Sequence, residues 1–298
     1  MLTAYAQNLQ PPRARGAAAP NVSARPLAAG SAAEVLSFLA ARPAQTVCMA
    51  GLVRDNGLAS PLNRGAFYGC RDERGTFEGV ALLGHATLFE ARTERALAAL
   101  ARAARNARPA HMIMGEREQL ASFWEHYATP DTPAPRHATR EQLLALRFPV
   151  PALPPAGALR PAGAAELDLL LPVQAELAAA ASGVDPRAGD AEGFRARCAR
   201  RLAQGRTWAV VEDTRLLFKA ELQAVTPEAV YVEGVYVAPA ARAQHFGARC
   251  LSQLCRQLLG HTATVCLYVN EQNRAAQALY RKVGFRHAGD CDTIFLPR

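Results

Sequence analysis

Prolines crowd one segment in the middle of this chain, and this segment constrains the fold more than any other feature. Seven of the 20 prolines lie within residues 130–155, interrupted by one patch, Arg140–Leu146, that predicts a helix. Proline lacks a backbone N–H and fixes φ, so this density indicates a domain boundary. A chain of 298 residues is long enough for two domains. We therefore expect a disordered tail over 1–30, an N-terminal α/β domain over 31–150 and a second domain over 155–298.

Composition narrows the class of protein. Hydrophobic residues make up 50% of the chain and charged residues 20%, which is typical of soluble globular proteins. No apolar run approaches the ~20 residues that cross a bilayer, so no membrane partner is expected. The basic stretch before Glu34 favours a disordered tail over an organellar transit peptide, because prolines interrupt its helical pattern.

Charge and cysteine usage exclude two further classes. The net charge is +8, but lysine occurs only at Lys219 and Lys282, and no run of five basic residues exists. This pattern does not predict a nucleic-acid partner. The seven cysteines show neither C-x-x-C pairs nor zinc-ligand spacing. We interpret them as reduced core thiols of a cytoplasmic protein, with no metal site.

Strands and helices alternate in both halves. In the second half, short turns separate strands predicted at 207–212, 215–225 and 229–237, which favours antiparallel pairing. Helices are predicted there at 168–181, 190–204, 246–259 and 272–283, and strands at 159–161, 264–269 and 293–296. In the first half, a hairpin (66–70 with 77–87) precedes a helix at 93–107, a strand at 111–114 and a helix at 116–127.

The segment Val235–Ala248 predicts an anion-binding site. A strand leads through a loop containing Arg242 and Gln244 into a helix that starts near Phe246. Free N–H groups and the positive end of the helix dipole converge at such a start, where a pyrophosphate can dock. Gly247 has no Cβ and lets the backbone approach the phosphate oxygens.

This segment resembles the acyl-CoA motif of the GNAT N-acetyltransferase superfamily, in which a Val-x-Val-x-Pro strand precedes Arg/Gln-x-x-Gly-x-Gly/Ala. Here the motif is Arg242-x-x-His245-x-Gly247, so histidine, a residue type that is enriched at positive φ, replaces the first glycine. The resemblance implies that acetyl-CoA binds here. The implied contact residues are Val235, Tyr236, Val237, Arg242, Gln244, His245, Phe246, Gly247 and Ala248. The N–H groups of Val235–Val237 would polarise the thioester carbonyl.

A second motif, near the C-terminus, strengthens the resemblance. The family pattern strand–Asn-x-x-Asn-x-x-Ala-x-x-x-Tyr-x-x-x-Gly-Phe is matched with Asn270, Asn273 and Tyr280. Asn273 and Tyr280 are seven residues apart and are therefore predicted to lie on one helix face. By resemblance, Asn270 and Asn273 contact the cofactor, and Tyr280 lies beside the thioester sulfur. A phenol of pKa ~10 can act as the acid for a departing thiolate of pKa ~8.5.

The general base is open between two carboxylates. Glu233 is two residues before Val235, which predicts the same strand face, and many GNAT enzymes use a carboxylate on this strand. Glu221, on the preceding strand with Lys219 on its face, is the rival candidate.

The resemblance implies a mixed, mostly antiparallel α/β sheet flanked by helices, the GNAT fold. The first half has the same order of elements without the phosphate loop, and it resembles an uncharacterised domain found ahead of some bacterial GNAT domains. We expect a tandem architecture whose degenerate N-terminal domain borders the acceptor site instead of binding CoA. The expected function is transfer of acetyl from acetyl-CoA to an amine, on a small molecule or a protein, by direct attack. The alternative is a non-catalytic acyl-CoA-binding regulatory module. Neither the acceptor nor the oligomeric state is indicated.

Overall fold

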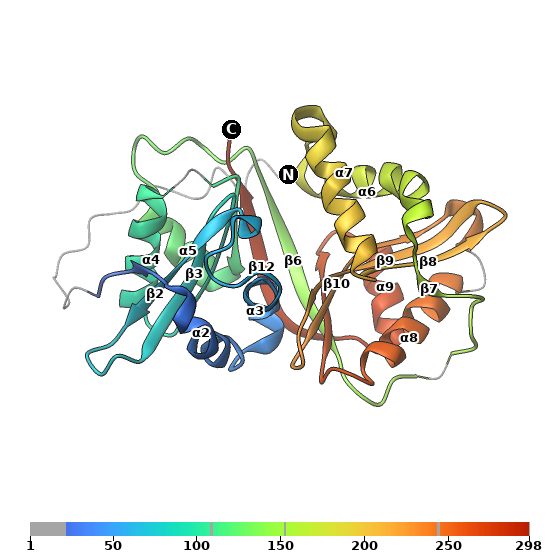
Figure 1. Ribbon diagram of the computed structural model, residues 1–298, viewed down its shortest axis with the longest axis horizontal. Helices are drawn as coiled ribbons and strands as arrows, with labels where there is room; N and C mark the ends of the chain where they lie inside the picture. The colour runs from blue at the N-terminus through green and yellow to red at the C-terminus, as the bar shows by residue number, and fades with distance from the viewer. Residues whose placement is uncertain (1–21, 108–109, 152, 243–244, 298) are drawn as a thin grey trace. The chain divides into compact units, whose positions relative to one another are not determined.

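The computed structural model describes residues 22–107, 110–151, 153–242 and 245–297. Contacts between Cα atoms divide the chain into unit 1 (Met1–Leu143 with Gly289–Arg298) and unit 2 (Leu144–Ala288). The division falls inside the proline-dense segment. The last ten residues belong to unit 1, unlike the expected 155–298 domain, because strand β12 (Arg286–Phe295) pairs within the sheet of unit 1. Each unit is described by itself (Figure 1).

Unit 1 is a mixed sheet with helices packed on it. Its elements are β1 (Arg25–Pro26), η1 (Ala29–Ser31), α2 (Ala32–Leu39), α3 (Pro43–Asn56), η2 (Pro61–Asn63), β2 (Gly65–Arg71), β3 (Phe77–Gly84), β4 (Ala86–Ala91), α4 (Glu94–Asn106), β5 (Met112–Glu116), α5 (Arg117–Tyr127) and most of β6 (His137–Leu146) and β12. The strand order is β1-β2-β3-β4-β5-β12-β6. Neighbours pair in antiparallel fashion from β1 to β4 and between β5 and β12, whereas β4 and β5 are parallel.

Helix α4 illustrates how the sequence builds unit 1. Thr93 caps the helix, because its Oγ1 accepts a hydrogen bond from the N–H of Ala96 at 3.3 Å. The buried face consists largely of alanine and leucine, and small side chains let the helix approach the sheet closely. A Cβ on Gly79 of β3 would lie only 3.0 Å from Leu100 Cδ1. The absence of a Cβ at Gly79 therefore allows helix α4 to pack close to strand β3.

Unit 2 contains the predicted site. Its elements are β7 (Arg160–Pro161), η3 (Ala164–Glu166), α6 (Leu167–Ser182), α7 (Arg187–Ala203), β8 (Thr207–Glu212), β9 (Arg215–Val225), β10 (Val230–Val237), η4 (Pro239–Ala241), α8 (Phe246–Leu258), β11 (Val265–Asn270) and α9 (Arg274–Val283). The strand order is β11-β10-β9-β8-β7, antiparallel except for the parallel pair β10 and β11. These mixed, mostly antiparallel sheets flanked by helices confirm the predicted fold class.

The sheet of unit 2 separates two apolar layers. On one face, α8 and α9 pack against the sheet in a core that includes Phe218, Val232 and Leu251, each 0–1% exposed. On the other face, α6 and α7 contribute Leu170 and Leu202 to smaller clusters. Successive side chains of a strand in this sheet therefore face opposite helix layers.

Three sequence predictions of secondary structure were wrong. Arg140–Leu146 is part of strand β6 instead of a helix. The prediction of a single strand over 77–87 missed β4, and no element was predicted where α3 lies. The last strand, predicted at 293–296, spans the whole of β12.

The second part of the proline-dense segment is packed, unlike a free linker. Val150 and Ala156 are buried in the core of unit 2. Arg249 of α8 donates hydrogen bonds to the carbonyls of Pro154 (3.1 Å) and Pro155, and Ser252 donates to that of Pro151 at 3.0 Å. Residues 150, 151 and 153–156 thus lie along α8, since proline carbonyls still accept hydrogen bonds.

Candidate active site

The start of α8 has the predicted geometry of an anion site. His245 is the N-cap, with φ 58° and ψ 26°, so the histidine takes the left-handed conformation that a glycine would adopt. It provides no side-chain cap, and the N–H groups of the first helical turn have no intrahelical acceptor. Arg242 donates from Nε to the carbonyl of Val237 at 3.2 Å. Gln244 lies outside the described residues.

Gly247 serves the packing of α8, a role that the sequence analysis missed. A Cβ at this position would lie 2.6 Å from Val237 Cγ2 and 3.0 Å from Leu279 Cδ1. Such approaches are shorter than van der Waals contact, so the missing Cβ is what allows α8 to lie against β10 and α9. The expected close approach of the backbone to phosphate stays a prediction for the same residue.

In the part of the chain that the structure describes, strands β10 and β11 of unit 2 pair only where both begin. Among the described residues, the register between β10 and β11 consists of Val230 with Val265 and Tyr231 with Cys266. The later residues of β10 keep their partners in β9 as far as Val237. The edge of β10 that faces β11 therefore has backbone groups outside this ladder, next to the start of α8.

A β-bulge in β10 places Glu233 and Val235 on opposite faces of the strand. The register with β9 shifts between Glu233 and Tyr236, and Gly234 has φ +58°. Val235 packs with the α8–α9 core, whereas Glu233 contacts Arg201 of α7 on the other side. The prediction that Glu233 and Val235 share a face was wrong, because the bulge inserts a residue and breaks the two-residue alternation.

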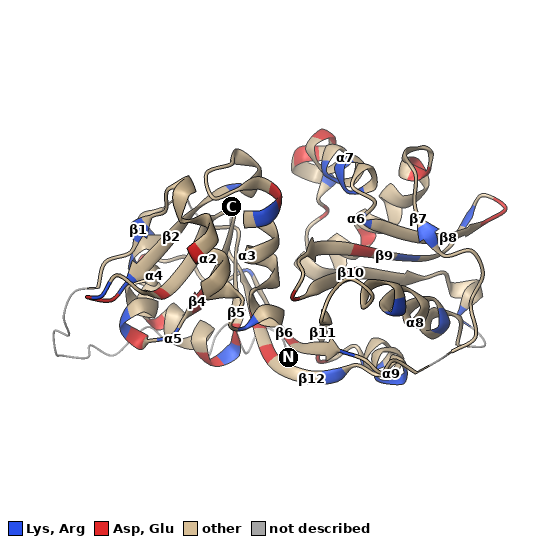
Figure 2. Ribbon diagram, turned by 60° about the horizontal axis from the view of Figure 1, so that its bottom comes forward, with Lys and Arg blue, Asp and Glu red and all other residues tan. Residues whose placement is uncertain are grey.

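Both candidate bases lie side by side in a charged cluster. Glu221 of β9 is the direct cross-strand neighbour of Glu233 of β10. Arg201 contacts both carboxylates, reaching Glu233 Oε1 at 3.2 Å and also bonding Glu221. Lys219 Nζ lies 3.1 Å from Glu221 Oε1 and donates to Gln174 of α6. Figure 2 shows acidic and basic segments within β9 itself.

The surroundings of Glu221 and Glu233 shift the pKa values of the two carboxylates in opposite directions. Lys219 and Arg201 outweigh the cost of burial and hold the pKa of Glu221 below its ordinary value. Burial raises the pKa of Glu233, and the neighbouring charge of Glu221 raises it further, against the opposing effect of Arg201. The Glu233 side chain is 28% exposed, so solvent moderates this rise. Glu233 is thus the carboxylate better suited to accept a proton.

The two asparagines of the second motif order the loop that starts α9. Asn270 Oδ1 accepts from the N–H of Gln272 at 2.8 Å, and Asn273 caps the helix by accepting from the N–H of Ala276 at 3.0 Å. Asn273 therefore precedes the helix instead of lying within it. Gln277, which the sequence analysis missed, is fully buried and donates to the carbonyls of Asn270 (3.1 Å) and Glu271 (2.8 Å). The sequence signal for this role is a glutamine one helical turn after the N-cap Asn273.

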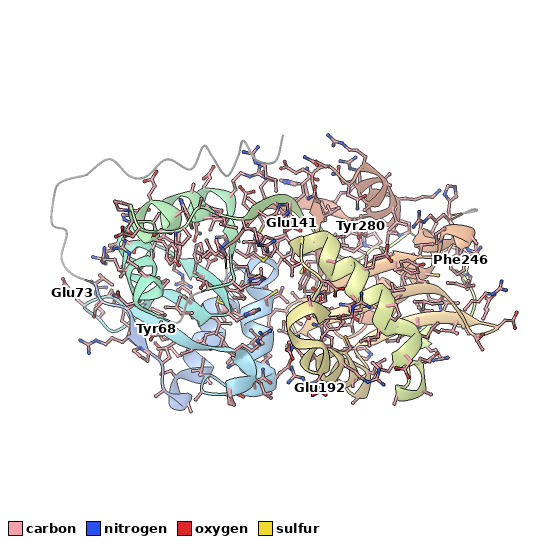
Figure 3. All side chains as sticks on the ribbon, turned by 90° about the horizontal axis from the view of Figure 1, so that it is seen from above. Tyr68, Glu73, Glu141, Glu192, Phe246 and Tyr280 are labelled. Carbon is pink, nitrogen blue, oxygen red and sulfur yellow. The ribbon has the colours of Figure 1, made fainter. Side chains whose placement is uncertain are left out.

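Tyr280 is buried on α9 (8% exposed), and its ring contacts Phe285 edge to face at 5.9 Å. Burial raises the pKa of this phenol to about 12, with a smaller contribution from Cys255 of α8. Its hydroxyl is therefore protonated across the physiological range. Figure 3 labels Tyr280 and Phe246, one on each of the two helices that cover this face of the sheet.

Unit 1 has a different arrangement at the corresponding strand pair. Its β4 reaches α4 through Arg92 and Thr93, and Thr93 itself caps the helix. A Cβ on Gly115 of β5 would lie 2.6 Å from Phe89 of β4, and Phe89 stacks on Phe123 at 4.2 Å. Side chains of unit 1 thus fill the space between β4, β5 and α5 at this position.

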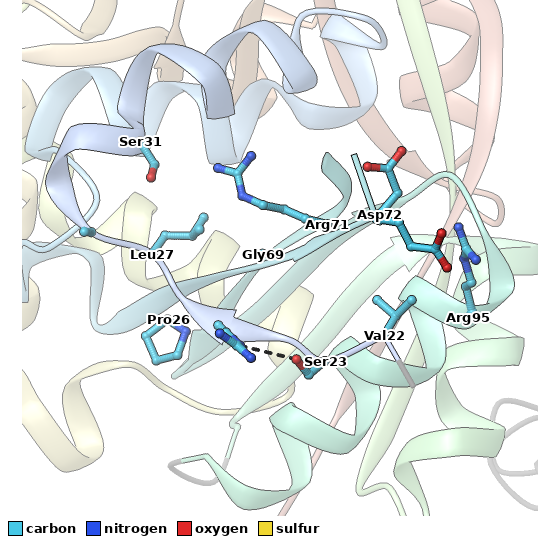
Figure 4. A pocket seen from close by; sticks show the side chains of 12 residues that line it. Val22, Ser23, Pro26, Leu27, Ser31, Gly69, Arg71, Asp72 and Arg95 are labelled. Atoms are coloured by element: carbon cyan, nitrogen blue, oxygen red, sulfur yellow. Dashed lines mark hydrogen bonds between the residues drawn. The ribbon is translucent and has the colours of Figure 1, made fainter. Parts of the chain in front are cut away.

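A hollow of about 590 Å³ in unit 1 contains none of the predicted site residues (Figure 4). Its wall includes β1, the end of β2 and the following turn. Two of its arginines are neutralised, Arg71 by Glu34 and Arg95 by Glu78. This hollow therefore has no strong preference for an anion.

The comparisons with known proteins agree with this geometry. Residues 173–285 match the model of the Acetyltransferase (GNAT) family. The match spans the two motifs, both candidate bases and Tyr280. This part of the chain therefore carries a GNAT-type domain. No curated protein matches the chain.

Solved structures extend the likeness of fold to both units. A Drosophila protein is 14% identical with a TM-score of 0.66, covering 93% of this chain and 99% of its own. A GCN5-related N-acetyltransferase from Sphaerobacter thermophilus is 14% identical with a TM-score of 0.58, covering 94% and 97%. A tandem GNAT protein from the clavulanic acid biosynthesis pathway is 17% identical with a TM-score of 0.53, covering 93% and 99%. The fold is thus of the tandem GNAT type.

The described residues offer neither a metal-ligand cluster nor a helix that could span a membrane. Residues 22–107, 110–151, 153–242 and 245–297 contain no cluster of three or more His, Cys, Asp or Glu side chains placed to hold a metal ion. In the same residues, no helix combines the length and apolarity needed to cross a membrane.

Proposed function

We propose that this protein is an acetyl-CoA-dependent N-acetyltransferase that transfers the acetyl group directly to an amine, on a small molecule or a protein. The observation that carries the proposal is the open start of α8 beside the strands β10 and β11, with Tyr280 and Glu233 in the same unit. The diphosphate of CoA would accept hydrogen bonds from the N–H groups of Phe246, Gly247 and Ala248. Asn270 and Asn273 would border the pantetheine arm.

Glu233 is the proposed base. An alkyl ammonium must lose a proton before its nitrogen can attack, and a carboxylate with a raised pKa accepts that proton at a smaller free-energy cost. Glu221 is the weaker candidate, because two cations compete for its oxygens. The neutral amine then attacks the thioester carbon, and the N–H groups at the β10 bulge stabilise the oxyanion that forms.

The C–S bond breaks as the amide forms, the nitrogen loses its second proton to solvent, and CoA leaves as a thiolate that takes up a proton from solvent. Tyr280 is the proposed donor at the sulfur. Its pKa of about 12 makes complete transfer to a thiolate of pKa ~8.5 uphill by about three units. The phenol therefore acts mainly by donating a hydrogen bond to the thiolate, a narrower role than the general acid suggested by a pKa near 10.

Direct attack is favoured over an acyl-enzyme. Cys250, Cys255 and Cys266 of unit 2 are fully buried, and burial raises the pKa of each thiol. A thiol that stays protonated is a poor nucleophile. The positive φ of His245 supports CoA binding, which the enzyme and the regulatory alternative share.

The test is release of CoA thiol from acetyl-CoA in the presence of a panel of primary amines. Amine-dependent release by the full chain is the expected result. Binding of CoA without turnover on any amine would favour the regulatory module instead. No binding of CoA by folded protein would contradict both.

A further inference from the structure

Lys219 carries a positive charge in the core of unit 2, where a charge is energetically costly. Its side chain is 0% exposed, at the middle of β9. Burying an ammonium costs several kcal/mol unless partners surround it. The chain has only one other lysine, Lys282, and 32 arginines. Most basic positions of this chain are therefore arginine, and Lys219 departs from that preference.

The ammonium of Lys219 has three oxygen partners from three elements. They are Glu221 Oε1 at 3.1 Å, Gln174 Oε1 of α6, and the carbonyl oxygen of Gly234 at 3.4 Å. A charged ammonium has three donors and no acceptor, so this set satisfies it. The third partner belongs to the bulge of β10, next to the proposed oxyanion site.

Gly234 is shaped to receive this ammonium. A Cβ there would lie 3.0 Å from Lys219 Nζ and 3.5 Å from Gln174 Oε1. Its φ of +58° also favours glycine. Lysine and glycine therefore fit each other at the bulge.

The contact with Lys219 fixes the orientation of the peptide unit between Gly234 and Val235. A trans peptide is planar, so its carbonyl and its N–H point in opposite directions. With the Gly234 carbonyl aimed at Lys219 on the α6–α7 side, the N–H of Val235 points to the opposite side, where Val235 packs with the α8–α9 core. The register with β9 pairs neither residue, so this N–H is outside that ladder.

We propose that Lys219 is a positioning residue for the transfer reaction: its ammonium holds and polarises the Gly234–Val235 peptide, so that the Val235 N–H donates to the thioester carbonyl. A cation at the carbonyl oxygen strengthens the donor at the other end of the same amide. The inference rests on the proposed function, because it assigns a partner to that N–H. Lys219 itself touches no substrate.

The experiment compares Lys219→Met/Glu221→Gln with wild type. Removing both charges avoids leaving a lone buried carboxylate, which would destabilise the fold for another reason. Lys282→Met is the matched control, since Lys282 is exposed on α9. Glu221→Gln alone is the second control, because it separates the loss of the Glu221 carboxylate from the loss of the Lys219 side chain. The measurements are the melting temperature, the dissociation constant of CoA, kcat, and the infrared carbonyl stretch of bound acetyl-CoA labelled with ¹³C at the carbonyl.

In the double variant we expect kcat to fall about tenfold or more, as when an oxyanion donor is weakened. The carbonyl stretch should shift toward its value in water, while the dissociation constant of CoA, which has no thioester carbonyl, stays within twofold. An unchanged kcat and stretch would overturn the proposal. Wild-type protein without turnover would instead refute the proposed function.

Should the double variant fail to fold, Gln174→Leu tests the same point. It removes an uncharged partner of the ammonium and adds no charge to the core. A several-fold loss of kcat with a shifted carbonyl stretch is expected. No change in either would overturn the role of Lys219.

Discussion

Glu221 and Glu233 are direct cross-strand neighbours, and their surroundings give them opposite pKa shifts. In the described part of the chain, Glu221 is ion-paired with both Lys219 and Arg201, whereas Glu233 is ion-paired with Arg201 alone. Arg201 therefore links the two carboxylates while leaving one available as a base. Such a separation of two nearby carboxylates is how proteins assign them different roles.

Glu233→Gln should lower kcat/KM by about 10²-fold, because the amide cannot accept the proton of the ammonium. The unfolding temperature should change little, since glutamine keeps the size of the side chain and one oxygen for Arg201. Glu192→Gln, at an exposed position of α7, is the matched control. Wild-type rates in Glu233→Gln at saturating amine would remove Glu233 from the mechanism.

The pH profile should carry the signature of Glu233. Its pKa in the folded protein is raised above 4.5, and the base must be ionised to work. The rate on the acid side should therefore rise with pH through an inflection above 4.5, and Glu233→Gln should lose that limb. A group with a raised acid pKa binds more protons when folded, so its contribution to stability falls as pH rises through the same window.

Tyr280→Phe should lower kcat by about 10²-fold and leave KM for acetyl-CoA nearly unchanged, because only the hydrogen bond to the departing sulfur is lost. The phenyl ring retains the contact with Phe285, so the fold should survive. Tyr127→Phe in unit 1 controls for loss of a hydroxyl elsewhere. Steady-state thiol release measures both parameters, and an unaltered kcat would show that the hydroxyl has no part in catalysis.

Gly247→Ala should lower both stability and affinity for CoA. The new methyl group would meet Val237 and Leu279, and overpacking of this kind costs about 1–3 kcal/mol. Moving α8 away from β10 would also displace its first N–H groups. Gly30→Ala is the control, because no atom lies within 4 Å of a Cβ built there. Denaturant unfolding and calorimetry with CoA check the pair; equal behaviour of the two variants would contradict the packing.

Lys219 should titrate below the ordinary lysine value, since burial lowers its pKa. Lysine labelled with ¹³C at Cε gives two signals in this chain, and Lys282→Arg assigns them. Between the folded pKa and the unfolded value near 10.5, the unfolded chain binds more protons, so this group makes stability increase with pH. A Lys219 signal that titrates at or above 10.5 would contradict the buried site.

The motifs made much of the site predictable. Strand, loop and helix start were readable around His245, and its positive φ followed from the glycine that it replaces. The charged cluster was only partly predictable, because Arg201 and Gln174 come from helices that lie far from β10 in sequence. The bulge at Gly234 was not predicted, although an isolated glycine within a strand is its usual signal.

The errors in fold arose where tertiary pairing overrode local preference. Residues 140–146 are rich in helix formers, yet they extend as β6 because β12 lies beside them. Helix α3 has a weakly amphipathic sequence, so periodicity did not reveal it, although Pro43 at its first position and Gly57 after its end are the expected signals. That the last ten residues join unit 1 depends on pairing across the sequence, which no local pattern encodes.

Titration calorimetry of the full chain with acetyl-CoA at low salt tests the central claim most directly. One molecule should bind per chain, because helix α8 of unit 2 starts without a side-chain cap, whereas Thr93 caps helix α4 of unit 1. Binding should weaken in Gly247→Ala and persist in Gly30→Ala. A folded wild-type protein that produces no binding heat at several temperatures and leaves its melting temperature unchanged with acetyl-CoA would contradict the account.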